Sequence, residues 1–92
     1  MDKELCFISV IGNDRKGIIA TIANYLYRHE INIEDLSQKI MQGYFVMTML
    51  VDVKDSPTPL ETIRLDLAEI GKEMSLKIQI QHENIFNAMH RV

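Results

Sequence analysis

The 92-residue sequence contains a single cysteine, and none of its hydrophobic runs approaches the roughly 20 residues that a membrane-spanning helix needs. One cysteine cannot form a disulfide within the chain, so Cys6, which lies in an apolar run, is expected to be a buried thiol in a reducing compartment. The N-terminus lacks the hydrophobic segment and the small-residue cleavage site of a secretory signal. We therefore expect a soluble cytoplasmic protein that makes no membrane contact.

The chain also lacks any block of like charge. Its 13 acidic and 10 basic residues give a formal net charge of -3, which does not attract a polyanion. A sheet that binds RNA needs several stacking aromatic residues in a basic surround, and Phe7 and Tyr44 are too few, so nucleic acid is not an expected partner. The three histidines have no spacing that joins them as ligands, so neither a metal nor a cofactor is expected.

What the chain does contain is an alternation of strand and helix patterns over one domain, residues 1–92. The expected elements are a strand over 4–11, a helix of about three turns from 17, a strand over 32–42, a strand over 44–53, a helix over 59–71, a strand over 74–82 and a short helix near 85–89. This βαββαβ order predicts the α+β class, namely a ferredoxin-like sandwich whose four-stranded antiparallel sheet carries two helices on one face and a short C-terminal helix.

Several details of these elements are also predicted. The buried stripe of the first helix is Ile18, Ile19, Ile22, Ala23 and Leu26, with His29 towards solvent, and that of the second helix is Leu60, Ile63, Leu67 and Ile70. Thr58, Pro59 and Glu61 predict an N-cap, a first-turn proline and a capping box, and Gly71 predicts a left-handed stop. Because Ile33, Leu36 and Ile40 share no parity, the strand over 32–42 is expected to be bulged or bent.

The loop over residues 12–17 is the main candidate site. Its backbone N–H groups include the unpaired donors of a helix N-terminus, which suit a carboxylate. Asp14 could hold an ammonium group, and Arg15 or Lys16 could hold an acid. The same Gly, Asn and Asp residues also make a good turn, and from this chemistry alone the turn interpretation ranks first. A phosphate-binding loop is unlike this sequence, because Ile18 and Ile19 stand where Lys and Ser or Thr are needed.

The motif G-x-D-R-x-G-I at 12–18, followed by I-N-I at 31–33, resembles the ACT domain over nearly the whole chain. The segments E-D-L-S-Q at 34–38, Y-F-V-M at 44–47 and N-I-F-N-A-M at 84–89 resemble more narrowly the stand-alone ACT proteins of the UPF0237 group. The resemblance implies a single regulatory domain that binds an effector amino acid at an interface between two ACT domains, against the first loop and the second-strand region. Lys16 departs from the pattern, because many members have proline there.

By position, the resemblance implies that Asp14 and Asn32 make polar ligand contacts, while Gly17 and Ile18 allow backbone approach. The expected ligand-binding residues are Asn13, Asp14, Arg15, Gly17, Ile18, Asn32 and Ile33. Asn32 has an equally weighted interpretation as a residue that merely turns the chain after a helix. The predicted function is a non-catalytic module that binds a small molecule, an amino acid, as a homodimer, and that could regulate a partner protein in trans.

The alternative from another class is a small acylphosphatase-like enzyme of the same fold, which also uses an Arg and an Asn beside its first loop. That motif needs more glycines and a different place for the arginine, and no general base, nucleophile or paired carboxylates converge in this sequence. We therefore expect no enzymatic activity.

The sequence also predicts an interface. The apolar residues Phe7, Tyr44 and Val46 occupy outward positions of the strands. The tail helix adds a further apolar set, Ile85, Phe86 and Met89. Either the tail packs on its own sheet, or two copies share the surface about a twofold axis. The resemblance favours the second arrangement.

Overall fold

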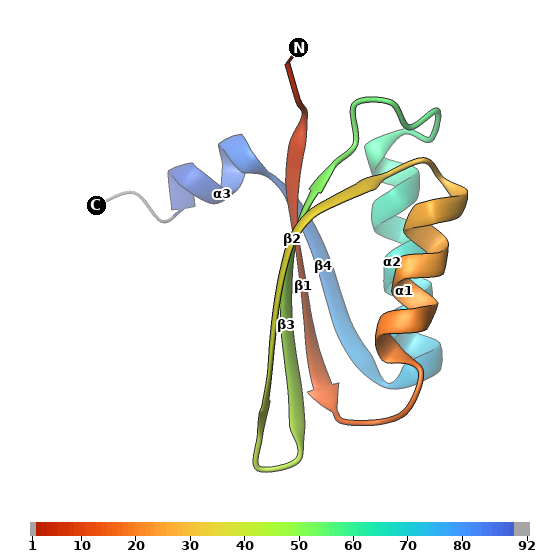
Figure 1. The fold of residues 1–92 in the computed structure, drawn as a ribbon, viewed down its shortest axis with the longest axis vertical. Coiled ribbons are helices and arrows are strands. Elements are labelled where there is room, and N and C mark those ends of the chain that lie inside the picture. Colours follow the sequence, from red (N-terminus) through yellow and green to blue (C-terminus); the bar gives the residue numbers. More distant parts are fainter. Residues whose placement is uncertain (1, 90–92) are drawn as a thin grey trace.

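The computed structural model describes residues 2–89, with the side chains of residues 86, 87 and 89 excepted, and it confirms the predicted βαββαβ order with a tail helix (Figure 1). The elements are β1 (Leu5–Asn13), α1 (Ile18–Arg28), β2 (Asn32–Met41), β3 (Tyr44–Asp52), α2 (Leu60–Met74), β4 (Leu76–His82) and α3 (Glu83–Met89). No helix in this described part of the chain is long and apolar enough to cross a bilayer.

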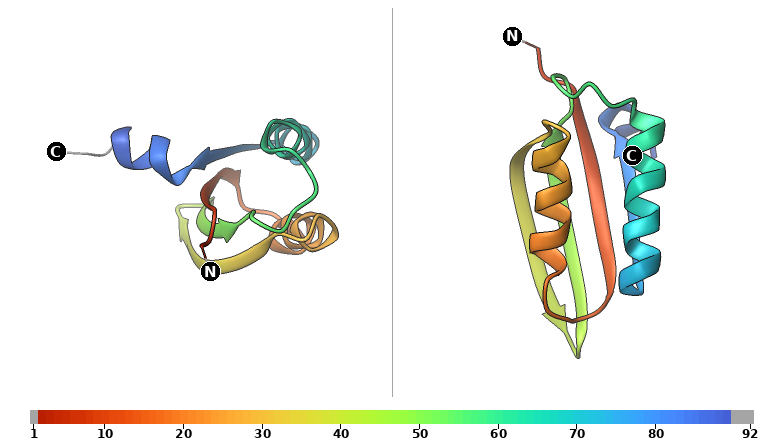
Figure 2. Two further views of the ribbon diagram at one scale, coloured as in Figure 1. Left: turned by 90° about the horizontal axis from the view of Figure 1, so that it is seen from above. Right: turned by 90° about the vertical axis from the view of Figure 1, so that its right-hand side faces the viewer.

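The four strands form one antiparallel sheet in the order β2-β3-β1-β4, so β2 and β4 are its edges. Both long helices cover the same face, which confirms the ferredoxin-like sandwich (Figure 2). We call the opposite side, which no helix of the fold covers, the outer face. From the end of β4, α3 projects to the side of the outer face and away from the rest of the chain (Figure 1).

The core lies between the sheet and the two long helices. Inward residues alternate with outward ones along β1, β3 and β4, and the inward residues are buried: Cys6, Ile8, Val10, Phe45, Met47, Met49, Val51, Leu76, Ile78 and Ile80. The helices contribute Ile18, Ile22, Tyr25, Leu26, Ile63 and Leu67. Burial, with smaller contributions from nearby carboxylates, raises the pKa of the Cys6 thiol to about 11. Cys6 is therefore a packing residue, as expected.

The predicted bulge in β2 is confirmed. The β2–β3 register shifts between Ile33 and Asp35, and after the shift Leu36 pairs with Met49. The bulge puts all three apolar residues of β2 opposite inward residues of β3, because Ile33 pairs with Val51 and Ile40 with Phe45. Ile40 nevertheless remains 60% exposed, because it lines a surface hollow described below.

Both predicted end signals of α2 are wrong. Pro59 is the N-cap residue and no side chain caps the helix, since Thr58 Oγ1 lies 2.8 Å from His29 Nδ1 and Glu61 pairs with Arg64. Gly71 does not stop the helix, which continues to Met74 and ends at Ser75 with a φ of 59°. Met74 therefore belongs to α2 and not to the last strand.

Close packing is what requires glycine at position 71. A Cβ atom there would lie 2.5 Å from the carbonyl oxygen of Leu76, the first residue of β4. The helix and the strand that follows it therefore approach each other at this point more closely than any side chain would permit.

The predicted helix faces need three corrections. Tyr25 is buried while Ile19 is exposed, and the Tyr25 hydroxyl donates a 2.6 Å hydrogen bond to Asp66 of α2. His29 is half-buried and stacks on Tyr25 with 4.2 Å between ring centroids, so it does not face solvent freely. Leu60, expected in the buried stripe of α2, is exposed at the first turn.

Candidate functional site

The first loop is anchored at the hairpin end of the sheet. The backbone N–H of Asp14 donates a 2.9 Å hydrogen bond to the carbonyl of Gly43, in the turn between β2 and β3. Gly17 then takes a φ of 86°, which favours glycine, and precedes the first residue of α1. No side chain caps this end of α1 and its first turn holds no acidic residue. Its first N–H groups and its positive dipole end are thus available to an anion.

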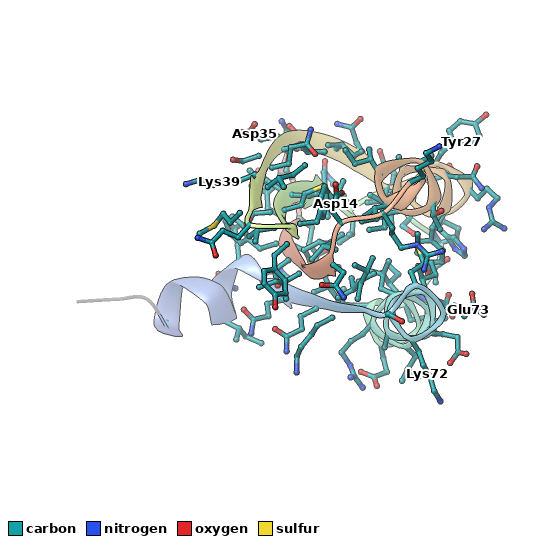
Figure 3. All side chains as sticks on the ribbon, turned by 90° about the horizontal axis from the view of Figure 1, so that it is seen from below. Asp14, Tyr27, Asp35, Lys39, Lys72 and Glu73 are labelled. Atoms are coloured by element: carbon teal, nitrogen blue, oxygen red, sulfur yellow. The ribbon has the colours of Figure 1, made fainter. Side chains whose placement is uncertain are left out.

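Four of the predicted site residues lie together around one surface hollow of about 290 Å³. They are Asp14, Arg15, Gly17 and Ile18, and Figure 3 shows Asp14 at this end of the molecule. The opposite wall comes from Gln38, Ile40 and Phe45 of β2 and β3. The arrangement places a carboxylate, helix N–H donors and apolar side chains within one small space. These groups match an ammonium, a carboxylate and a short side chain.

Sequence reasoning missed Gln38 and Ile40 as lining residues. Gln38 lies opposite the inward residue Met47 and shares its parity with Leu36 and Ile40, so its side of the sheet could have been predicted from the period, whereas its place beside the loop before α1 depends on the fold. Ile40 could have been predicted as a lining residue, because an apolar residue near the end of an edge strand has few partners to bury it.

Arg15 lines the hollow and also makes a hydrogen bond that holds two parts of the fold together. Its guanidinium donates a 3.3 Å hydrogen bond to the carbonyl oxygen of Met74, at the C-terminal end of α2. This carbonyl belongs to the negative end of the α2 dipole, so the contact is favourable. Gly12, the other glycine beside the loop, packs against β4, because a Cβ there would lie 2.7 Å from Leu76 Cδ2. Gly12 therefore allows close packing and not the approach of a ligand.

The remaining predicted residues lie elsewhere. Asn13 is exposed and pairs with Tyr44 at the end of β1, outside the lining of the hollow. Asn32 and Ile33 begin β2 opposite the last residues of β3, at the other end of the sheet. Since β3 has nine residues at about 3.3 Å each, these two ends are roughly 26 Å apart. Asp14 and Asn32 therefore do not meet within one chain.

A polar chain of contacts surrounds Asn32. Its side-chain amide donates a 2.7 Å hydrogen bond to Glu34, whose other carboxylate oxygen lies 2.5 Å from Lys3 Nζ. The hydrogen bond from Lys3, followed by that from Asn32, lowers the pKa of Glu34. Nearby, Asp52 accepts hydrogen bonds from the backbone N–H groups of Lys54 and Glu4, which lower its pKa. The contacts at this end of the sheet join charged side chains to one another and to the backbone, and they leave no apolar wall like that of Ile40 and Phe45 beside the hollow.

A second hollow, of about 300 Å³, was not predicted. It is lined by Asp2, Lys3, Glu4, Lys54, His82, Glu83 and Asn84. His82 Nδ1 accepts a hydrogen bond from the backbone N–H of Asn84, and His82 Nε2 lies 3.4 Å from Glu4. These contacts fix the start of α3. Within the described residues, no three His, Cys, Asp or Glu side chains are placed to hold a metal ion.

Comparisons with known proteins bear on the family and the fold of the chain. The sequence profile of the ACT domain matches residues 4–81. A UPF0237 protein of Methanopyrus kandleri is 41% identical over 85 residues, which cover 92% of this chain and 94% of that protein. A UPF0237 protein of Clostridium acetobutylicum is 47% identical, with coverage of 92% and 96%. The solved structure of an ACT domain protein from Streptococcus pneumoniae is similar with a TM-score of 0.81 at 30% identity, covering 97% of this chain and 100% of that one.

Proposed function

The chain belongs to the ACT domain family, a small-molecule-binding regulatory fold, and from this premise we propose that it is a non-catalytic module that binds an amino acid between two copies of itself. The observation that carries the proposal is the hollow beside α1, where Asp14, the open N-terminus of the helix and apolar side chains face one space. The carboxylate of the ligand would accept hydrogen bonds from the helix N–H groups, and its ammonium group would face Asp14.

A second copy would complete this site through β2. As an edge strand, β2 has unpaired backbone groups along one side, which can pair with another strand. Antiparallel pairing of two β2 strands about a twofold axis sets the start of one strand beside the end of the other. Asn32 of the second copy would then lie near Gln38 and Ile40, which wall the hollow of the first. This arrangement unites Asp14 and Asn32, which a single chain holds apart.

The contacts of Arg15 support a binding role over the acylphosphatase-like alternative. A catalytic arginine of the first loop would direct its guanidinium to the substrate, whereas Arg15 is bonded to the Met74 carbonyl. The buried free thiol of Cys6 suits a reducing compartment such as the cytoplasm. A module of this kind would act in trans, by presenting a ligand-dependent surface to a regulated protein.

The test is calorimetry of the full chain against the twenty amino acids, followed by variants of the site. We expect one or a small group of amino acids to bind, with at least a tenfold loss of affinity in Asp14→Ala and in Asn32→Ala. Asn24→Ala, an exposed asparagine of α1, is the matched control and should bind normally. The proposal is wrong if no amino acid binds, or if Asp14→Ala binds as tightly as the unmodified chain.

Mixing the two variants tests whether the site is shared. In a mixed pair, one site combines intact Asp14 from one chain with intact Asn32 from the other, so binding should return. With random pairing of symmetric dimers, about a quarter of the sites recover. No recovery after subunit exchange would mean that both residues act within one chain or not at all.

A further inference from the structure

The outer face of the sheet carries apolar side chains that no part of the described fold covers. Ile11 and Met41 are each 50% exposed and Tyr44 is 55% exposed. Together with Gln42 and Val46 they line a hollow of about 510 Å³ at the hairpin end of this face. Exposed large apolar residues grouped around one hollow mark an interaction surface.

The tail helix does not cover this hollow. It begins after His82, which pairs with Cys6, whereas the hollow surrounds Ile11, five residues further along β1 and thus about 17 Å away. A seven-residue helix is only about 10 Å long, and α3 points away from its own sheet (Figure 1). Ile85 on this helix is 57% exposed. Both α3 and the hollow therefore have apolar surface to bury, and neither can satisfy the other within one chain.

The strand register arranges the outer face in rows that are symmetric about a central row of small or polar residues. The central row is Ser37, Thr48, Ser9 and Gln79. On one side lies the row of Asp35, Leu50, Phe7 and Gln81, and on the other the row of Lys39, Val46, Ile11 and Lys77. The two flanking rows thus match in apolar positions and differ in charge.

We propose that two copies of this chain pack outer face to outer face about a twofold axis that runs along the central row. Rotation about this axis places Asp35 of each copy opposite Lys39 of the other, and Ile11 opposite Phe7. It also brings the α3 end of each copy, beside edge strand β4, over the hairpin end of the other, where Ile85 would approach the hollow from the side of Ile11 on the neighbouring strand β1. Figure 3 shows Lys39 directed away from the helix-covered side of the sheet, as this pairing requires.

The area of the outer face is close to what such a contact needs. Four strands about 4.8 Å apart and seven residues long form a face of roughly 19 by 23 Å, or about 440 Å² on each copy. Two such faces approach the ~1,000 Å² that a specific interface needs, and the two tail helices extend the contact further. Short side chains at Ser9, Ser37 and Thr48 allow the two sheets to come close along the axis.

This interface is separate from the β2 edge that would complete the ligand site. With both contacts formed, the chain would be a tetramer of about 43 kDa, and with the outer face alone a dimer of about 21 kDa. Loss of the contact between outer faces halves the mass in either case. A failure of this proposal therefore appears in the mass, whereas a failure of the proposed ligand site appears in ligand binding.

Charge reversal with light scattering tests the twofold pairing. Asp35→Lys and Lys39→Asp each place like charges opposite one another across the axis, so each full-length variant should show half the mass of the unmodified chain at tens of micromolar. The double variant Asp35→Lys with Lys39→Asp restores opposite charges and should restore the mass. Unchanged mass in both single variants, or no recovery in the double variant, would overturn the arrangement.

Cross-linking tests the position of the axis and of α3. Thr48→Cys, near the axis, should cross-link to itself with a short bis-maleimide, whereas Thr21→Cys, exposed on α1 on the helix side, should not. A mixture of Ile11→Cys and Ile85→Cys chains should give a linked pair that neither chain gives alone. A monomeric unmodified chain, or Ile85→Cys linking only to itself, would show that α3 does not enter the hollow of a second copy.

Discussion

The guanidinium of Arg15 and the carbonyl oxygen of Met74 are joined by a 3.3 Å hydrogen bond between residues 59 positions apart. This contact ties the loop before α1 to the last residue of α2. Arg15 also lines the candidate hollow, so one side chain serves both the fold and the site. A ligand that drew Arg15 toward itself would weaken its hold on α2. The contact thus links the candidate ligand site to the second helix.

Arg15→Ala should therefore lower the stability of the protein modestly. Loss of a cationic partner at the C-terminal end of a helix costs about 0.5–1 kcal/mol, and because Arg15 is exposed we expect the lower part of that range. Urea unfolding measures the change, and Lys16→Ala, also exposed in the same loop, is the control. If Arg15→Ala unfolds as the unmodified chain does but no longer binds amino acids, Arg15 is a ligand contact and its link to Met74 is incidental.

The element order could be predicted from the sequence because each strand and helix shows its own period. The bulge in β2 was predictable for the same reason, since the apolar residues Ile33 and Leu36 break the parity. The end of α2 was not, because a glycine signals both a left-handed stop and a close approach. At Gly71 the second explanation holds, and it depends on the path of β4 after the helix has ended.

The candidate site could be predicted only in part, for a related reason. Residues 14–18 are near in sequence, so their motif places them together at the start of α1. Whether Asn32 joins them depends on the length and register of the β2–β3 hairpin, which set Asn32 opposite Asp52 at the far end. Side-chain partners such as His29 for Thr58 likewise require the packing of two distant segments.

Gly71→Ala should destabilise the protein although alanine is the better helix former. The added Cβ would lie 2.5 Å from the carbonyl oxygen of Leu76 and 3.2 Å from Ile78 Cγ1, so β4 must move away from α2. Overpacking of this kind costs about 1–3 kcal/mol, which exceeds the gain of about 1 kcal/mol from helix propensity.

The matched control for Gly71→Ala is Ala68→Gly on the exposed side of α2, which should lose about 1 kcal/mol from propensity alone. Urea denaturation compares the two variants. A Gly71→Ala protein more stable than the unmodified chain would contradict the close approach of β4.

Tyr25→Phe should remove the hydrogen bond that joins the two long helices. The Tyr25 hydroxyl donates to Asp66 over 2.6 Å, and both burial and this bond raise the pKa of the phenol. Loss of a partly buried hydrogen bond to a charged group lowers the free energy of unfolding by about 1–2 kcal/mol. The ring and its stacking on His29 remain in the variant, so the change isolates the hydroxyl.

Tyr27→Phe is the control for the hydroxyl of Tyr25, because Tyr27 is 80% exposed on the same helix and should tolerate the change without measurable loss. Thermal unfolding followed by circular dichroism measures both variants. Equal melting temperatures for the two would show that the Tyr25–Asp66 bond adds nothing to stability.

Cys6 should make the protein less stable at alkaline pH. Burial raises its pKa from about 9 to about 11 in the folded state, with smaller contributions from Glu4, Glu83 and Asp52. Between these values the unfolded chain loses the thiol proton while the folded chain keeps it, so stability falls as the pH rises through this window, by about 1 kcal/mol per pH unit. Urea unfolding at pH 8, 9.5 and 10.5 measures the slope, and Cys6→Ala, which has no thiol to ionise, should show a shallower one. The same slope in both proteins would mean that Cys6 does not control the alkaline loss of stability.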